Sequence, residues 1–90
     1  MKRYLVETYL ARGATAERVA HDRRARSAAE ALASESRRVR FDRSIHVPED
    51  EICFFVFDAP TSRDAALVAE RAGLDPVRIV EAISSGEDGE

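Results

Sequence analysis

The sequence predicts an α+β protein in which two helices pack on one face of a four-stranded antiparallel sheet. Segments with strand character and segments with helix character follow one another in the order β-α-β-β-α-β. A short turn at 48–51 joins the second and third strands, which is typical of an antiparallel hairpin. Residues 52–57 are six apolar residues in a row, as expected for a central strand covered on both faces.

Four segments have the composition of strands, which we expect at 3–10, 37–47, 51–58 and 78–84. The first is rich in aromatic and β-branched residues. The second alternates between apolar and polar residues, so it should have an apolar face and a polar face. The predicted apolar face, which includes one arginine, is made by Val39, Phe41, Arg43, Ile45 and Val47. The predicted polar face is made by Arg38, Arg40, Asp42, Ser44 and His46.

Two segments have the apolar spacing of helices, 15–36 and 62–72. The first carries a narrow apolar stripe made by Ala25, Ala28, Ala29 and Leu32, and the second carries one made by Ala65, Val68, Ala69 and Ala72. We expect Thr15 to be the N-cap of the first helix. Thr61 and Asp64 resemble a capping box for the second, and Gly73 is suited to the position after its end.

This element order is that of the ferredoxin-like fold, in which the first and third strands are central and both helices lie on one sheet face. We expect a single domain over residues 1–84 and a disordered acidic tail over 85–90. The second sheet face then has no cover within the chain. A homodimer packed face to face, as in the dimeric α/β barrels, or a ligand held between two subunits, would cover it.

Composition favours a cytoplasmic protein that does not enter a membrane. Cys53 is the only cysteine, and no stretch approaches the roughly 18 apolar residues of a membrane helix. Arginines cluster at 21–26 and 37–40, but acidic residues interrupt and follow them, and the net charge is −3. We interpret these clusters as solvated, ion-paired surfaces, place His21 among the solvated residues, and expect no nucleic-acid partner.

Several short motifs together resemble one family of small bacterial proteins. They are "RYLVE" at 3–7, "VRF" at 39–41, "FDAP" at 57–60 and "ERAG" at 70–73. In this order they resemble the DUF4242, or nickel-binding-protein-like, family over about residues 2–83. The resemblance implies a ferredoxin-like dimer and the possibility of bound nickel. The chain departs from the family pattern where Phe55 replaces a cysteine, Val68 replaces a histidine and Phe41 replaces a tryptophan.

Glu7 and Glu81 are the candidate catalytic residues, because the first and last strands are neighbours in this fold. If both point to the same face, the two carboxylates could share a proton, act as a general base or hold a metal. The alternative is that they are solvated, or paired with Arg43 or Arg78.

His46 and Cys53 are the candidate metal ligands, because they flank the turn on adjacent strands. Imidazole and thiolate together suit zinc, nickel or copper, although two ligands do not complete a site. The alternative is a buried cysteine that packs as a small hydrophobe beside a surface histidine.

Tyr9, Phe55 and Phe57 are candidate ligand-binding residues, with Arg43 as a polar group. If their face is the uncovered one, they line a cleft between two subunits. The alternative is a dry interface.

We therefore expect a binding protein that holds a metal ion, with nickel the implied choice, or a small ligand at the sheet face of a homodimer. An enzyme that uses a sheet-face carboxylate and no tightly bound cofactor, or a structural module, remain the alternatives. Motifs typical of serine hydrolases, nucleotide-binding proteins and structural zinc sites do not occur in the sequence.

Overall fold

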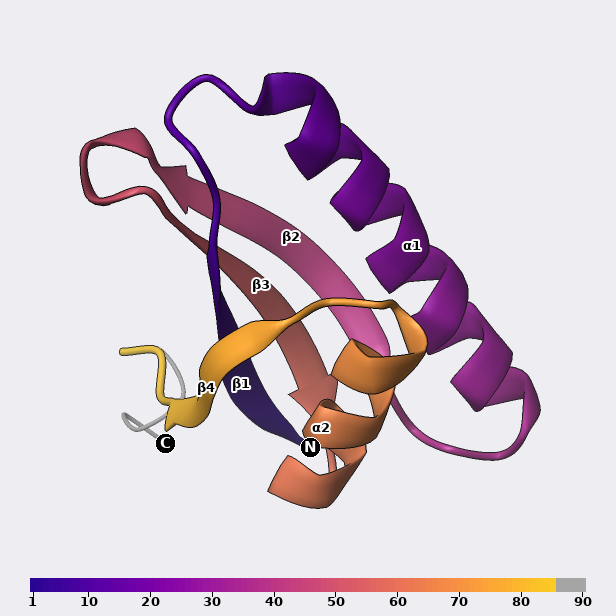
Figure 1. The fold of residues 1–90 in the computed structure, drawn as a ribbon. Helices are drawn as coiled ribbons and strands as arrows, with labels where there is room; N and C mark the ends of the chain where they lie inside the picture. The colour runs from indigo at the N-terminus through magenta and orange to yellow at the C-terminus, as the bar shows by residue number, and fades with distance from the viewer. Residues whose placement is uncertain (86–90) are drawn as a thin grey trace.

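A computed structural model describes residues 1–85 and confirms the predicted element order (Figure 1). The elements are β1 (Lys2–Tyr9), α1 (Thr15–Ser34), β2 (Arg40–Val47), the 3-10 turn η1 (Pro48–Asp50), β3 (Ile52–Ala59), α2 (Ser62–Arg71) and β4 (Pro76–Ala82). Except for Ser85, the predicted tail lies outside the described residues. No helix within residues 1–85 is long and apolar enough to cross a membrane.

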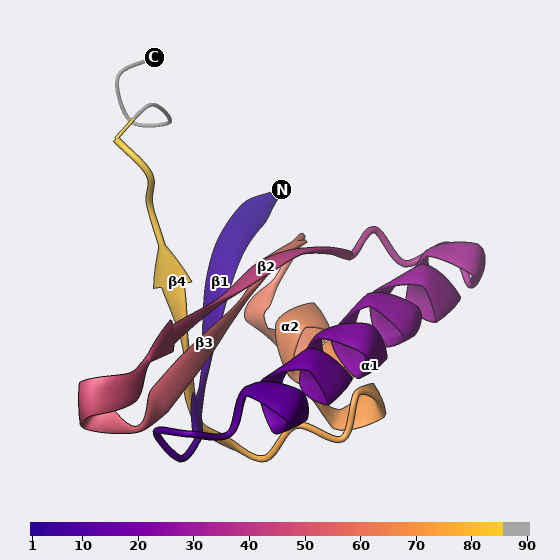
Figure 2. The same cartoon turned by 90° about the horizontal axis from the view of Figure 1, so that it is seen from above.

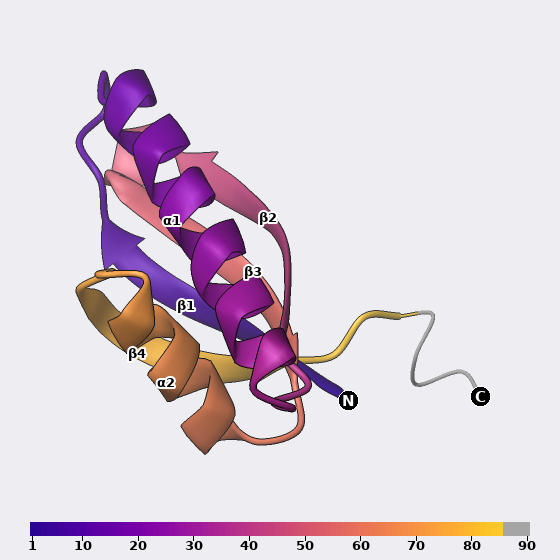
Figure 3. The same cartoon turned by 90° about the vertical axis from the view of Figure 1, so that its right-hand side faces the viewer.

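The sheet is antiparallel throughout and its strand order is β2-β3-β1-β4, so β1 and β3 are central as predicted. Both helices cover the same face (Figures 2 and 3), which is the ferredoxin-like arrangement. We call the opposite face, on which no helix of residues 1–85 lies, the open face.

The core lies between the sheet and the helices. The residues of the central strands that point toward the helices are buried, and they include Val6, Phe55 and Phe57 with no exposed surface. Both predicted alanine-rich stripes face them, made by Ala25, Ala28, Ala29 and Leu32 of α1 and by Ala65, Val68 and Ala69 of α2. Small side chains at these positions let both helices lie close to the sheet, so the aromatic rings fill most of the core.

The predicted alternation of the second strand is wrong, because β2 contains a β-bulge. Phe41 pairs with Phe57, whereas Arg43 pairs with Val56, so Asp42 is an extra residue in the strand. An extra residue reverses the side on which the following residues point. Phe41 therefore faces the helices, while Arg43, Ile45 and Val47 lie on the open face.

The helix ends were predicted with mixed success. The N-cap of α1 is Ala14, which makes no side-chain cap, and Thr15 is already the first helical residue. The N-cap of α2 is Thr61, as predicted: its hydroxyl accepts a hydrogen bond from the Asp64 N–H at 3.2 Å and donates to the Asp64 carboxylate at 2.9 Å. Gly73 follows α2 with a φ of 71°, a conformation that favours glycine.

The Thr61 cap yields a testable prediction. Replacing Thr61 by Ala should lower the free energy of unfolding by about 1 kcal/mol, because the first turn of α2 loses its side-chain acceptor. Urea denaturation of T61A measures the loss. The matched control is S62A, which removes an exposed hydroxyl one residue later. Equal losses in the two variants would contradict the role of the cap.

Candidate functional site

The open face carries apolar residues near its centre and charged residues on either side of them. Strand register assigns to it, from β1, Arg3, Leu5, Glu7 and Tyr9, and from β3, Ile52, Phe54, Val56 and Asp58. Val56 is only 3% exposed although no helix covers it. Its register partners on this face are Leu5 and Arg43, so neighbouring side chains already shield the middle of β3.

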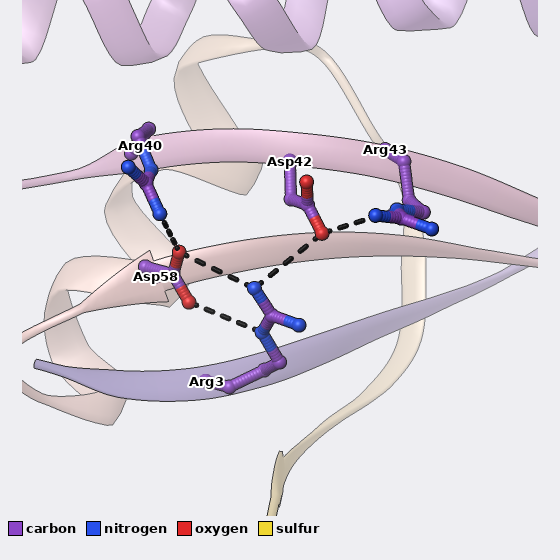
Figure 4. A network of polar contacts seen from close by, with 5 residues as sticks. All are labelled: Arg3, Arg40, Asp42, Arg43 and Asp58. Atoms are coloured by element: carbon purple, nitrogen blue, oxygen red, sulfur yellow. Dashed lines mark hydrogen bonds and ion pairs between the residues drawn. The ribbon is translucent and has the colours of Figure 1, made fainter. Parts of the chain in front are cut away.

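An ion-pair network links three strands at one end of the open face (Figure 4). Arg3 contacts Asp58 through Nε at 3.2 Å, and Arg40 contacts the same carboxylate through Nη2 at 2.9 Å. The Arg3 Nη2 atom also lies 3.4 Å from Asp42 Oδ2, which accepts a hydrogen bond from Arg43 Nε at 3.2 Å. Register places Arg3 and Arg40 on either side of Asp58, and the bulge adds Asp42 to the network.

Asp58 is the most buried charged group of this network, with a side chain that is 12% exposed. Burial by itself raises the pKa of Asp58, but hydrogen bonds from Arg3 and Arg40 and their positive charges outweigh it. The pKa of Asp58 therefore lies below its ordinary value. The carboxylate is ionised at neutral pH and holds both guanidinium groups in place.

A hollow of about 280 Å³ opens beside this network. Its walls combine charged and apolar side chains, contributed by Arg3, Leu5, Asp42, Arg43, Ile45, Val56, Ala82, Ile83 and Ser84. Apolar walls with a few converging polar groups are the usual features of a small-molecule site, and the volume lies just below the usual range of about 300–1,000 Å³ for such sites. We call it the open-face hollow.

The structure does not bring Glu7 and Glu81 together. Glu7 is the register partner of Arg78, and its carboxylate accepts a hydrogen bond from Arg78 Nε at 2.9 Å on the open face. Glu81 is the register partner of Tyr4 and therefore belongs to the helix-covered side, where it lies 3.9 Å from Lys2 Nζ. The positions of the two residues in the β1–β4 ladder put them on opposite faces, so they cannot form one carboxylate site.

His46 and Cys53 are brought together as expected, as register partners on the helix-covered face. Cys53 is fully buried, and burial, followed by the negative charge of Asp22, raises the pKa of its thiol to about 11. The His46 Nε2 atom lies 3.4 Å from the carbonyl oxygen of Leu10. Within residues 1–85, no group of three or more His, Cys, Asp or Glu side chains is arranged to hold a metal ion.

The predicted aromatic set is divided between the two faces. Phe55 and Phe57 are fully buried toward the helices and do not line the open face. Tyr9 does lie on the open face, is 65% exposed, and its hydroxyl is 3.5 Å from Glu51 Oε1. In the β1–β3 ladder, each odd-numbered residue of β1 pairs with an even-numbered residue of β3, as Tyr9 does with Ile52. Register partners point to the same face, so Tyr9 lies on the face opposite to that of Phe55 and Phe57. Arg43 alone of the predicted ligand-binding residues lines the open-face hollow.

The prediction that His21 is solvated is wrong, because its ring packs against the ring of Phe55, with the two centroids 6.0 Å apart. Burial, followed by the charge of Arg24, lowers the pKa of His21. Its Nδ1 atom is buried without a hydrogen-bond partner in the described chain, as are Asp22 Oδ1 and Ser44 Oγ. A sequence signal for His21 existed, since it lies four residues before Ala25 and extends the stripe of α1.

Arg3 and Asp58 were not predicted as site residues, and Asp42 was expected only on the polar face of a regular strand. Asp58 had a signal, because it lies two residues after Val56 and therefore shares its face. A carboxylate at the end of an apolar central strand needs partners, and the arginine-rich second strand could supply them. The contact of Asp42 with Arg3 had no such signal, since it depends on the bulge.

No protein-family model matches the sequence, and neither does any curated protein sequence. Among solved structures, the chain resembles the crystal structure of SCO4226 from Streptomyces coelicolor A3(2), with a TM-score of 0.66. The match covers 92% of this chain and 98% of that one at 20% sequence identity. The likeness at this identity establishes the shared fold.

Asp58 should make stability depend on pH. A carboxyl group whose pKa is lowered by folding stabilises the native state above its ordinary pKa of 3.8, and this contribution is lost as the pH falls through and below that value. Replacing Asp58 by Asn should therefore cost roughly 1–3 kcal/mol at pH 7 and less at pH 3, as measured by urea denaturation. The control is D50N, which changes an exposed acid in the turn. A cost for D58N that is equal at both pH values would contradict the ionised network.

Cys53 should be unreactive in the native protein. Burial raises the pKa of the thiol from 9.0 to about 11, so the reactive thiolate is about a hundredfold scarcer at neutral pH than in the unfolded chain. Its reaction with a disulfide reagent should therefore be slower than that of the unfolded chain by about a hundredfold or more. Absorbance of the released thiolate, measured with and without urea, gives both rates. Reaction of the folded protein at the rate of the unfolded chain would contradict the burial of Cys53.

Proposed function

We propose that the protein is a small binding protein that acts as a homodimer and holds a small organic ligand in the open-face hollow. The observation that carries this proposal is the hollow itself, which combines apolar walls and charged groups on a sheet face that no helix of residues 1–85 covers. A hollow on a broad open face would be closed when a second copy packs against it.

Apolar residues on the open face support the homodimer. Ile45 is 47% exposed there, and it lies beside Phe54, its register partner on β3. Val80 of β4 pairs with Leu5 of β1 on the same face. A chain of 90 residues gains little stability from its own core, so burial of this face in a symmetric interface would add a substantial stabilising contribution.

An organic ligand agrees better with the site than a metal ion does. The open-face hollow contains one carboxylate, that of Asp42, and neither histidine nor cysteine among its lining residues. His46 and Cys53 lie on the other side of the sheet. The enzyme alternative has less support, because Glu7 does not line the hollow and its carboxylate is paired with Arg78.

Native mass spectrometry and sedimentation of the untagged protein test this proposal. We expect a dimer, and additional mass from a small molecule when purification is gentle. Replacing Ile45 by Glu should convert the dimer to monomer, because the interface would bury an unpaired charge. The matched control is V19E, since Val19 is 38% exposed but lies on α1. A wild-type monomer, or equal dissociation by both variants, would overturn the proposed dimer.

A further inference from the structure

We infer that the ligand of the open-face hollow is a small organic anion, namely a carboxylate attached to an apolar body. This inference rests on the proposed function, because it concerns the chemistry of the same hollow. It follows from the two arginines and the one carboxylate in the lining, and from the apolar side chains that complete it.

Arg43 is the donor best placed to bind a carboxylate. Its side chain is 69% exposed, and among residues 1–85 its guanidinium contacts only Asp42, through Nε at 3.2 Å. The two Nη atoms, which make none of these contacts, are the end of the guanidinium that can form two parallel hydrogen bonds with a carboxylate. Arg43 can therefore bind a carboxylate while Nε keeps its contact with Asp42.

Arg3 adds a second guanidinium whose position is already defined. It is held by Asp58 at 3.2 Å and by Asp42 at 3.4 Å, and its side chain is 26% exposed. A donor that is positioned before the ligand arrives loses little conformational entropy on binding. Arg3 therefore contributes a fixed positive charge to one wall of the hollow.

The charged side chains that line the hollow favour an anion. Two arginines, Arg3 and Arg43, are in the lining together with one aspartate, Asp42. Asp42 is the one carboxylate in the lining of the hollow, and its Oδ2 atom is already shared by Arg3 and Arg43. A cationic ligand would meet two guanidinium groups and would compete with them for Asp42, which is unfavourable.

The apolar walls determine the rest of the ligand. Leu5, Ile45, Val56, Ala82 and Ile83 supply most of the lining, and none of them can form a side-chain hydrogen bond. An inorganic anion such as phosphate would leave these walls in contact with water. A carboxylate on an aromatic or branched aliphatic body would cover them, and this burial adds to the affinity.

The experiment compares three probes of similar size on the full chain: benzoate, benzylammonium and benzyl alcohol. Binding is followed by the amide NMR signals of Leu5, Ile45 and Ala82, and inorganic phosphate is titrated separately. We expect benzoate to bind more tightly than the other three, and R43A to weaken benzoate by about tenfold, as expected for loss of a charge-assisted hydrogen bond. The affinity of R43K for benzoate should fall between those of the wild type and R43A, because lysine keeps the charge but lacks the planar guanidinium.

The control variant is R23A, which removes the same charge from an exposed position of α1 and should leave benzoate binding unchanged. Equal affinity for benzoate and benzyl alcohol, or no effect of R43A, would overturn the inference that the ligand is an anion. It would leave the proposed small-molecule function in place. Phosphate binding as tight as that of benzoate would overturn the inference that the ligand has an apolar body. Failure of all four probes to move any open-face signal would overturn both proposals.

Discussion

The pairing of β3 with β1 on one side and β2 on the other is the constraint on which the rest of the structure depends. This strand directs Phe55 and Phe57 into the helix-covered core and directs Val56 and Asp58 onto the open face. Apolar residues on both faces favour a central position, because side chains of the two neighbouring strands then flank them. The core and the candidate site are therefore built on the two sides of one strand.

The charge of Asp58, near the end of β3, determines which side chains must surround it. Asp58 is 9% exposed as a residue, and an ionised carboxylate at that depth needs charged partners to offset its desolvation. Arg3 and Arg40 come from the two neighbouring strands because register places them directly beside it. The contact with Arg3 that compensates Asp58 also positions one guanidinium group in the lining of the open-face hollow. Structural need and proposed binding chemistry thus share residues.

The helix-covered face also carries polar groups. His46, Cys53 and His21 lie there among buried groups, and Asp22 influences the thiol of Cys53. Burial favours the neutral forms of the His21 imidazole and the Cys53 thiol, which is the opposite of what metal ligation requires of a thiol. For this reason we place the proposed function on the open face, where the guanidinium of Arg43 is exposed.

The sequence by itself determined the element order, the central position of β3, the alanine stripes and the cap of α2, because each depends on local periodicity or on residues three or four positions apart. Tertiary structure alone decided which residues meet across the sheet. One extra residue, Asp42, moved the following side chains of β2 to the faces opposite to those predicted. The β1–β4 register placed Glu7 and Glu81 on different faces. The open-face hollow depends on these registers, since a shift of one residue moves a side chain to the other face. Contacts between neighbouring strands set those registers, and the alternation of apolar and polar residues within one strand does not reveal them.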